Sequence, residues 1–250
     1  DDVESRGLGD VYKRQRNMKQ IFPLNKRLEI IQELYNPEDI IIFDLEQINM
    51  SAERFIIDYL EQWKFKQIIV GEDFKFGNDQ KDVNYLKQYL PIKVVGREQD
   101  DVSTSLIKSK LISGEIEVVN DLLLKPYSYT GTVIDGNKLG RELGFPTANF
   151  FYDEGYILPS DGVYITKSIL NNKEYISLTF LGIPKTINGI TNKQFETYLL
   201  DYHGPEFYGQ SMTVTFFTKI SEVKKYSNLN DLVVGIKKQV EQAKKYFLKN

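Results

Sequence analysis

The first half of the chain alternates between two hydrophobic patterns. Apolar residues recur every three or four positions from Met18 to Leu34 and again after Ser51, a good helix N-cap, which predicts two amphipathic helices. The runs at 39–45 and 66–70 are nearly continuous in apolar residues, as is typical of buried strands in a parallel sheet. This alternation predicts an α/β domain of Rossmann-like type, with ligands at the carboxyl ends of its strands.

The second half shows a different pattern, in which β-rich runs follow one another with Gly, Asn and Pro turns between them. Strands without intervening helices predict an antiparallel β-barrel. In the last run, alternation places one set of side chains on a single face: Met212, Val214, Phe216, Thr218 and Ile220. From Leu229 to Phe247 the apolar spacing returns to three or four, which predicts a C-terminal helix packed on the barrel.

The domain boundaries follow from these changes of pattern. Residues 1–16 have no hydrophobic period and many charges, so we expect a non-native or disordered leader there. The first domain then spans 17–124. Pro126, after an apolar helix end, marks the link to a second domain at 125–250.

Composition excludes several functions. The chain has 250 residues with 32 basic and 35 acidic side chains, a net charge of −3, which argues against a nucleic-acid partner. The absence of cysteine excludes disulfides and thiol chemistry, and the single histidine, His203, excludes any site that needs two. No apolar run is long enough to span a membrane and no secretory signal is present, so we expect a cytoplasmic protein without a membrane partner. Oligomeric state is left open.

The stretch at 131–150, GTVIDGNKLGRELGFPTANF, carries the best candidate chemistry in the chain. Its glycines allow backbone N–H groups to approach an anion, and Arg141 can bind phosphate oxygens. Thr147 and Asn149 offer the hard oxygen ligands that Mg²⁺ prefers, and Pro146 fixes the backbone just before them. These features predict a phosphate site, with a plain surface hairpin as the alternative.

This stretch resembles the signature of riboflavin kinases, GxVxxGxxxGRxLGFPTAN, which also marks the kinase half of bacterial bifunctional riboflavin kinase/FMN adenylyltransferases. The resemblance implies a small Greek-key barrel with a C-terminal helix, using ATP and Mg²⁺ to phosphorylate riboflavin. It implies that Arg141 and Asn149 act in catalysis and that Thr147 and Asn149 ligate the metal. The expected cofactor-binding residues of this stretch are Gly131, Gly136, Lys138, Gly140, Pro146 and Thr147. Tyr208 and Gly209 are expected to line the isoalloxazine or adenine pocket, although a tight turn is the alternative reason for Gly209.

Glu196 is the candidate general base. Strand alternation places it with Tyr198 on the face opposite Phe195 and Thr197, so large side chains flank its carboxylate. Such surroundings favour a raised pKa, although a solvent-facing glutamate is the alternative. The resemblance adds that Glu196 matches the family's catalytic base in its ExxLLDF-type strand.

The first half also resembles the adenylyltransferase half of the bifunctional enzymes. GEDFKFG matches VVGxDFxFG, and the segment from Ser103 matches SSTxIR, although helix capping is the alternative for its hydroxyls. The implied nucleotide-binding residues are Gly71, Asp73, Phe74, Gly77, Ser103, Thr104 and Ser105. A GxFDGxHxGH segment is absent from the sequence, so we expect an incomplete domain, with FMN adenylylation a property of a longer parent rather than of this chain.

Departures from the family gather on the side expected to bind flavin. Phe180 stands for Asn, Lys185 for Thr, Ser221 for Arg and Val223 for an acid. Because lysine does not replace the planar fork of an arginine, flavin affinity is less secure than nucleotide binding. The expected partners are therefore the small molecules riboflavin, FMN and ATP, with a weakened flavin- or nucleotide-binding module as the alternative to an enzyme.

Overall fold

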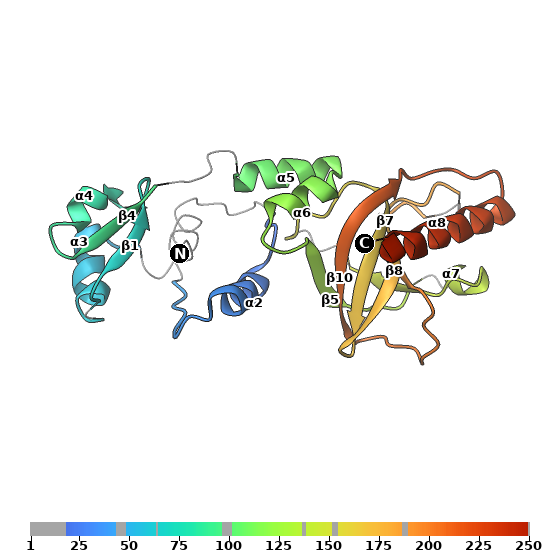
Figure 1. The fold of residues 1–250 in the computed structure, drawn as a ribbon, viewed down its shortest axis with the longest axis horizontal. Helices are drawn as coiled ribbons and strands as arrows, with labels where there is room; N and C mark the ends of the chain where they lie inside the picture. Colours follow the sequence, from blue (N-terminus) through green and yellow to red (C-terminus); the bar gives the residue numbers. More distant parts are fainter. Residues whose placement is uncertain are drawn as a thin grey trace. The chain divides into compact units, whose positions relative to one another are not determined.

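The computed structural model describes residues 19–43, 49–63, 65–96, 102–136, 139–151, 155–186 and 190–249. The chain forms two compact units, and Figure 1 labels most of their helices and several of their strands. The described part of unit 1 lies within 23–101, and unit 2 joins residues 19–22 to 102–249. The leader predicted at 1–16 lies outside the described residues.

Unit 1 is a small α/β unit. Its elements are α2 (Leu24–Tyr35), α3 (Ala52–Phe55), the π-helix η1 (Ile56–Leu60), β1 (Ile68–Gly71), β2 (Lys75–Phe76), β3 (Lys81–Asp82), α4 (Val83–Leu86) and β4 (Ile92–Val95). Strands β1 and β4 pair in parallel, as the apolar run at 66–70 predicts. Ser51 caps α3 by accepting a hydrogen bond from the Arg54 N–H at 3.4 Å. Ala52, Ile56 and Leu60 then bury their side chains with Phe76.

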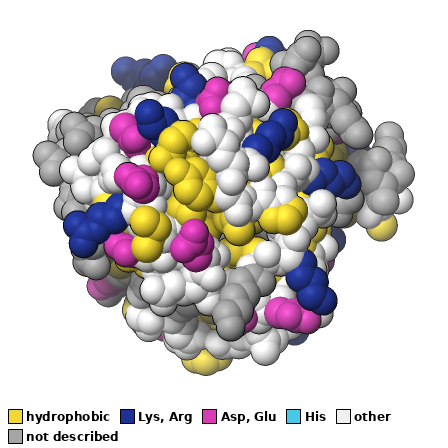
Figure 2. Space-filling model, turned by 90° about the vertical axis from the view of Figure 1, so that its left-hand side faces the viewer, with side chains coloured by type: hydrophobic (Ala, Val, Ile, Leu, Met, Phe, Trp, Pro, Cys, Tyr) yellow, Lys and Arg dark blue, Asp and Glu magenta, His cyan; other side chains and the backbone are white. Residues whose placement is uncertain are grey.

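The strand predicted at 39–45 is not found in its described part. Residues 39–43 form no strand, and the side chains of Ile41 and Ile42 are 52% and 55% exposed. In the described part of unit 1, β1 and β4 pair only with each other, so residues 39–43 add no strand to this sheet. Figure 2 looks onto a face of unit 1 on which hydrophobic side chains gather among charged ones.

Unit 2 is built around one antiparallel sheet. Its elements are α5 (Thr104–Ser113), α6 (Ile116–Leu122), β5 (Ser128–Thr132), α7 (Leu139–Glu142), β6 (Thr147–Phe150), β7 (Gly162–Leu170), β8 (Lys173–Gly182), β9 (Gln194–Leu199), β10 (Ser211–Ser221) and α8 (Leu229–Lys249). The strand order is β5-β10-β7-β8-β9-β6, with every neighbouring pair antiparallel. A bridge between Ile134, beyond β5, and Asn149 of β6 brings the two edges together, so the sheet curls into a half-barrel.

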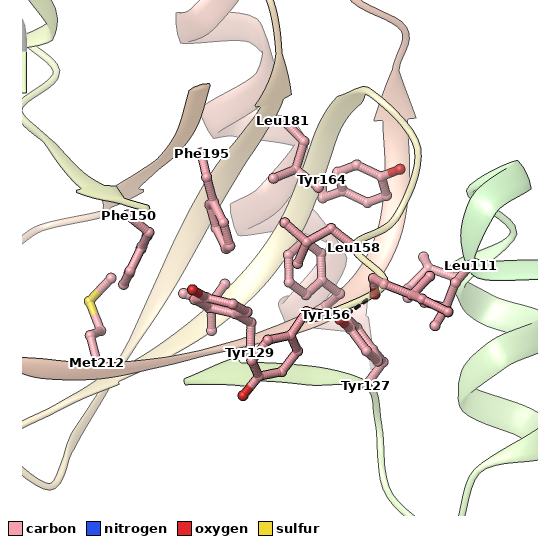
Figure 3. Packing of buried hydrophobic residues seen from close by; sticks show 14 of the residues in the cluster. Leu111, Tyr127, Tyr129, Phe150, Tyr156, Leu158, Tyr164, Leu181, Phe195 and Met212 are labelled. Atoms are coloured by element: carbon pink, nitrogen blue, oxygen red, sulfur yellow. Dashed lines mark hydrogen bonds between the residues drawn. The ribbon is translucent and has the colours of Figure 1, made fainter. Parts of the chain in front are cut away.

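The core of unit 2 is rich in aromatic side chains, several of which Figure 3 shows in contact. Tyr127, which directly follows Pro126 at the predicted link, is fully buried, and its hydroxyl donates to the Ile157 carbonyl at 2.7 Å. Leu111 of α5 and Ile116 of α6 are buried in the same cluster. Unit 2 therefore includes α5 and α6, which precede the boundary predicted near Leu124, because these helices bury apolar residues in its core.

The last strand departs from simple alternation. Met212, Val214 and Phe216 are buried on one face, as predicted. A β-bulge between Phe216 and Thr218 then shifts the register against β7, so Thr218 does not stay on that face. Beyond the bulge, Ile220 packs with Ile165 and with α8, the predicted C-terminal helix.

Candidate active site

Two hollows in unit 2 meet at strand β6. The polar pocket is lined by Gly136, Arg141, Pro146, Thr147, Asn149 and Tyr208. The cleft is larger, with an empty volume of about 1150 Å³ that includes its solvent-open part. Its lining comes from strands β6 to β10, from α7 and α8 and from the loops between them, and includes many apolar side chains. Thr147 and Asn149 line both hollows, so ligands bound in the two would meet at these side chains.

The pairing of β6 with β9 brings three predicted site residues together. Asn149 lies opposite Glu196, and Thr147 lies opposite Tyr198. The Thr147 hydroxyl donates to Glu196 Oε2 at 3.4 Å, and the Asn149 Nδ2 donates to the Thr147 carbonyl at 3.4 Å. One carboxylate therefore lies at the junction of the polar pocket and the cleft.

Glu196 faces the cleft rather than open solvent. On β8 its register partner is Phe180, and Leu178 lines the same cleft. Burial raises the pKa of Glu196, and the hydrogen bond from Thr147 lowers it by a smaller amount. The direction of this shift agrees with the prediction from strand alternation and suits a group that accepts a proton near neutral pH.

The polar pocket is shaped by a glycine and an arginine. A Cβ atom added at Gly136 would lie 2.2 Å from the Asn149 Nδ2, so a larger residue cannot occupy this position without moving Asn149. Arg141 lies on α7, with its Nη1 2.5 Å from Glu206 Oε1 and its Nη2 donating to the Tyr208 hydroxyl at 3.4 Å. The hydrogen bond to Glu206 raises the pKa of Arg141, which keeps a positive charge beside the pocket.

The remaining residues predicted to bind cofactor in the second half of the chain do not all line the polar pocket. Gly140 lines the cleft rather than the polar pocket, and Gly131 lines neither, lying instead against Tyr129. Gly209 has a positive φ of 78° and its N–H donates to the Val133 carbonyl at 2.8 Å, so it serves the turn after Tyr208. Lys138 lies outside the described residues.

The nucleotide-binding residues predicted in the first half fall in both units. Gly71, Asp73, Phe74 and Gly77 form the end of β1 and the turns that follow it, in unit 1. Ser103, Thr104 and Ser105 begin α5 in unit 2, where the Ser103 hydroxyl accepts a hydrogen bond from the Leu106 N–H at 3.1 Å. Helix capping is thus observed for Ser103, and nucleotide binding by these residues stays a prediction.

Several cleft residues were not singled out as site residues from the sequence. Leu232, Ile236 and Gln239 of α8 line the cleft, although the helical pattern indicated only packing. Tyr198 also lines it and meets Phe145 edge-on, with ring centroids 5.4 Å apart. The four residues that depart from the family pattern all line this cleft: Phe180, Lys185, Ser221 and Val223.

A divalent cation fits the polar pocket only as a partner of phosphate. The described residues hold no group of three or more histidine, cysteine, aspartate or glutamate side chains that could bind a metal alone. Thr147 and Asn149 supply hard oxygen atoms at the pocket, and Mg²⁺ commonly completes such a set with phosphate oxygens and water. Among the described residues, none of the helices combines the length and the apolar character that a membrane span needs.

A pocket lined by an arginine shares two residues with an apolar cleft, beside a partly buried carboxylate, and this arrangement is typical of an enzyme active site. Comparison with known proteins gives the family. A family model described as riboflavin kinase matches residues 123–247, and one described as FAD synthetase matches residues 9–114. The chain belongs to the bifunctional riboflavin kinase/FMN adenylyltransferase family, whose members are transferases that use ATP.

Individual relatives agree with this assignment. The trifunctional protein RibF/MnmA of Mycoplasmoides gallisepticum is 34% identical over 94% of this chain, which spans only 35% of that protein. The bifunctional riboflavin kinase/FMN adenylyltransferase of Mycoplasma pneumoniae is 31% identical over 82% of this chain and 74% of its own length. A crystal structure titled as a macrolide-efflux protein from Streptococcus pneumoniae has a TM-score of 0.77 and 26% identity, covering 90% of this chain and 75% of that one.

Proposed function

We propose that this chain transfers the γ-phosphoryl group of ATP to the 5′-hydroxyl of riboflavin, with ATP in the polar pocket and riboflavin in the cleft. The observation that carries the proposal is the junction at β6, where Thr147 and Asn149 line both hollows and Glu196 lies beside Thr147. A phosphoryl donor and an alcohol must meet in line for this reaction, and the junction offers such a place.

Glu196 acts as the general base in this proposal. Its carboxylate accepts the proton of the ribityl hydroxyl as that oxygen bonds to the γ-phosphorus, while the bond from phosphorus to the β–γ bridging oxygen breaks and ADP leaves. The raised pKa of Glu196 makes its carboxylate a better proton acceptor than an exposed glutamate. The Thr147 hydroxyl, donating to Glu196, orients that carboxylate at the junction.

The polar pocket supplies charge stabilisation. Arg141 and the Tyr208 hydroxyl line it and can donate to phosphate oxygens. Thr147 Oγ1 and Asn149 Oδ1 would hold Mg²⁺, which when bound neutralises charge on the phosphates. Because Gly136 has no side chain, the Asn149 amide can lie close against the backbone there, which holds this amide at the pocket.

The cleft matches the apolar body of a flavin. Val163, Leu178, Phe180 and Ile236 give it apolar walls on which a planar ring can pack. Tyr198 of β9 and Ile236 of α8 both line the cleft, so a flat ring bound there would contact side chains of both elements. With its ring against these walls, the flavin would extend its ribityl chain toward Glu196.

The region matched by the FAD synthetase model, residues 9–114, lacks one segment on which we expect FMN adenylylation to depend. An HxGH segment does not occur in these 250 residues, whose single histidine is His203. We therefore expect FMN, and not FAD, as the product of this chain.

The test is to incubate the purified chain with riboflavin, ATP and Mg²⁺ and to separate riboflavin, FMN and FAD by chromatography with fluorescence detection. FMN that depends on both ATP and Mg²⁺ supports the proposal. FAD would contradict the expectation drawn from the histidine count. Riboflavin binding without any product would favour the flavin-binding module instead.

A further inference from the structure

We infer that Glu206 is a positioning residue for nucleotide binding, because its carboxylate holds the Arg141 guanidinium at the wall of the polar pocket. Glu206 is not among the residues that line this pocket, whereas Arg141 and Tyr208 are. Glu206 therefore acts through Arg141 and not by touching the nucleotide. The inference rests on the proposed function, since it takes the polar pocket to be the phosphate site.

Arg141 has little support from its own element. It lies on α7, a single turn of four residues, and its side chain is half exposed. Its two described contacts both come from the β9–β10 loop, 65 to 67 positions further along the chain: Nη1 meets Glu206 Oε1 at 2.5 Å and Nη2 donates to the Tyr208 hydroxyl at 3.4 Å. Holding a long, flexible side chain in one geometry costs conformational entropy, and these contacts restrict it before a ligand arrives.

The β9–β10 loop is itself anchored on both sides of Glu206. Before it, the Tyr202 hydroxyl donates to the Pro205 carbonyl at 2.7 Å. After it, Phe207 packs against the core cluster and meets Tyr202 edge-on, with ring centroids 5.1 Å apart. The Gly209 N–H then donates to the Val133 carbonyl at 2.8 Å. Glu206 is thus held on a braced loop, which makes it a fixed point for Arg141.

The ion pair between Glu206 and Arg141 could instead weaken nucleotide binding. A carboxylate beside Arg141 could compete with phosphate for the guanidinium and weaken nucleotide binding. The geometry favours positioning, because a guanidinium carries more N–H donors than Glu206 and Tyr208 use, and Arg141 already lines the pocket. The two readings predict opposite changes in the KM for ATP when the charge of Glu206 is removed.

The experiment compares FMN formation by the wild-type chain with that of Glu206→Gln, Glu206→Asp and Glu174→Gln. Glu174 is a matched control, because it pairs with Lys167 at 2.8 Å, its side chain has the same 53% exposure as Glu206, and it lies outside both hollows. We expect Glu206→Gln to raise the KM for ATP by about two- to fivefold, the range of an exposed ion pair, with little change in kcat or in the KM for riboflavin. Glu206→Asp should recover most of the loss, and Glu174→Gln should change nothing.

Two further measurements separate positioning from general damage. In an Arg141→Met background, Glu206→Gln should have no additional effect, since the group it positions is gone. Titration calorimetry with Mg·ADP should show the same loss of affinity as the kinetics, independently of turnover.

Each outcome decides the question. If the wild-type chain forms FMN but Glu206→Gln has a lower or an unchanged KM for ATP, the positioning role is overturned and the proposed function stands. A wild-type chain that neither forms FMN nor binds Mg·ADP overturns both.

Discussion

The polar pocket and the cleft meet at the same two residues, yet they are built in opposite ways. The pocket depends on a one-turn helix, a glycine and a half-exposed arginine held by a distant loop. The cleft depends on long strands and a 21-residue helix, and it partly buries the Glu196 carboxylate. Charges in the pocket are therefore screened by solvent and salt, whereas the carboxylate in the cleft is tuned by desolvation. The effects of substitutions in the pocket and in the cleft should therefore differ in magnitude and in their dependence on pH and salt.

The largest effect should come from removing the base. Glu196→Gln keeps the shape of the side chain but cannot accept a proton, so we expect kcat to fall by about 10²- to 10⁴-fold. The KM for ATP should change little, because the polar pocket is lined by other residues. Steady-state FMN formation measures both quantities. Turnover equal to that of the wild type would remove Glu196 from the mechanism.

The shared residue Thr147 should give the next largest effect. Thr147→Val removes the hydroxyl that donates to Glu196 and that we propose as a metal ligand, so we expect kcat/KM to fall by about ten- to a hundredfold. Thr147→Ser keeps the hydroxyl and should retain most activity. Equal losses in the two variants would show that the methyl group, and not the hydroxyl, matters at this junction.

The pH dependence of the reaction should report the cleft rather than the pocket. Burial raises the pKa of Glu196 above its ordinary value of 4.5, so kcat/KM should fall as the pH drops through that raised pKa and the carboxylate is protonated. The hydrogen bond from Thr147 lowers the pKa, so the acidic limb of Thr147→Val should move to higher pH. A pH profile of kcat/KM for each variant checks this, and a shift to lower pH would contradict it.

The sequence was sufficient for the parts of the site that depend on local pattern. Strand alternation placed Glu196 among large side chains, and the stretch at 131–150 pointed to Thr147 and Asn149, which lie together in the structure. Their catalytic and metal-binding roles remain predictions. The first helix, the parallel strand at 66–70 and the C-terminal helix also followed from hydrophobic spacing.

Features that depend on tertiary pairing were missed for physical reasons. The Arg141–Glu206 pair joins segments far apart in the chain, and no local pattern signals it. The apolar run at 39–43 resembles a strand, but strand formation needs a partner, and periodicity does not reveal one. The β-bulge after Phe216 reverses the faces of the last strand without a Gly or Pro at the bulge to mark it.

A glycine in α8 offers a smaller test of the cleft. A Cβ atom added at Gly235 would lie 2.5 Å from the Tyr226 hydroxyl oxygen, and Tyr226 lines the cleft. Gly235→Ala should therefore push the Tyr226 ring toward the riboflavin site and raise the KM for riboflavin by about two- to tenfold, with the KM for ATP unchanged. In a Tyr226→Leu background the same change should have little kinetic effect, since the clashing ring is absent. An equal rise of both KM values would point to general damage.

The smallest expected effect is on the free energy of unfolding, and it compares the cleft with the polar pocket directly. A carboxyl group whose pKa is higher in the folded state than in the unfolded chain favours folding at low pH, and that contribution is lost as the pH rises through the folded-state pKa. At neutral pH the wild-type chain carries this penalty and Glu196→Gln does not. We expect Glu196→Gln to raise the free energy of unfolding at neutral pH by about 0.5–2 kcal/mol, a gain that shrinks as the pH falls through the pKa of Glu196.

Thermal unfolding of both variants from neutral to acidic pH provides the control. Glu206→Gln removes an exposed, paired carboxylate in the polar pocket's supporting loop, so it should give no such gain at neutral pH. If both variants gain equally, the effect reflects net charge and not burial, because each removes one negative charge from a chain whose net charge is −3. A gain confined to Glu196→Gln would mean that unit 2 gives up stability to keep a desolvated base in the cleft, a cost that the solvent-exposed polar pocket does not bear.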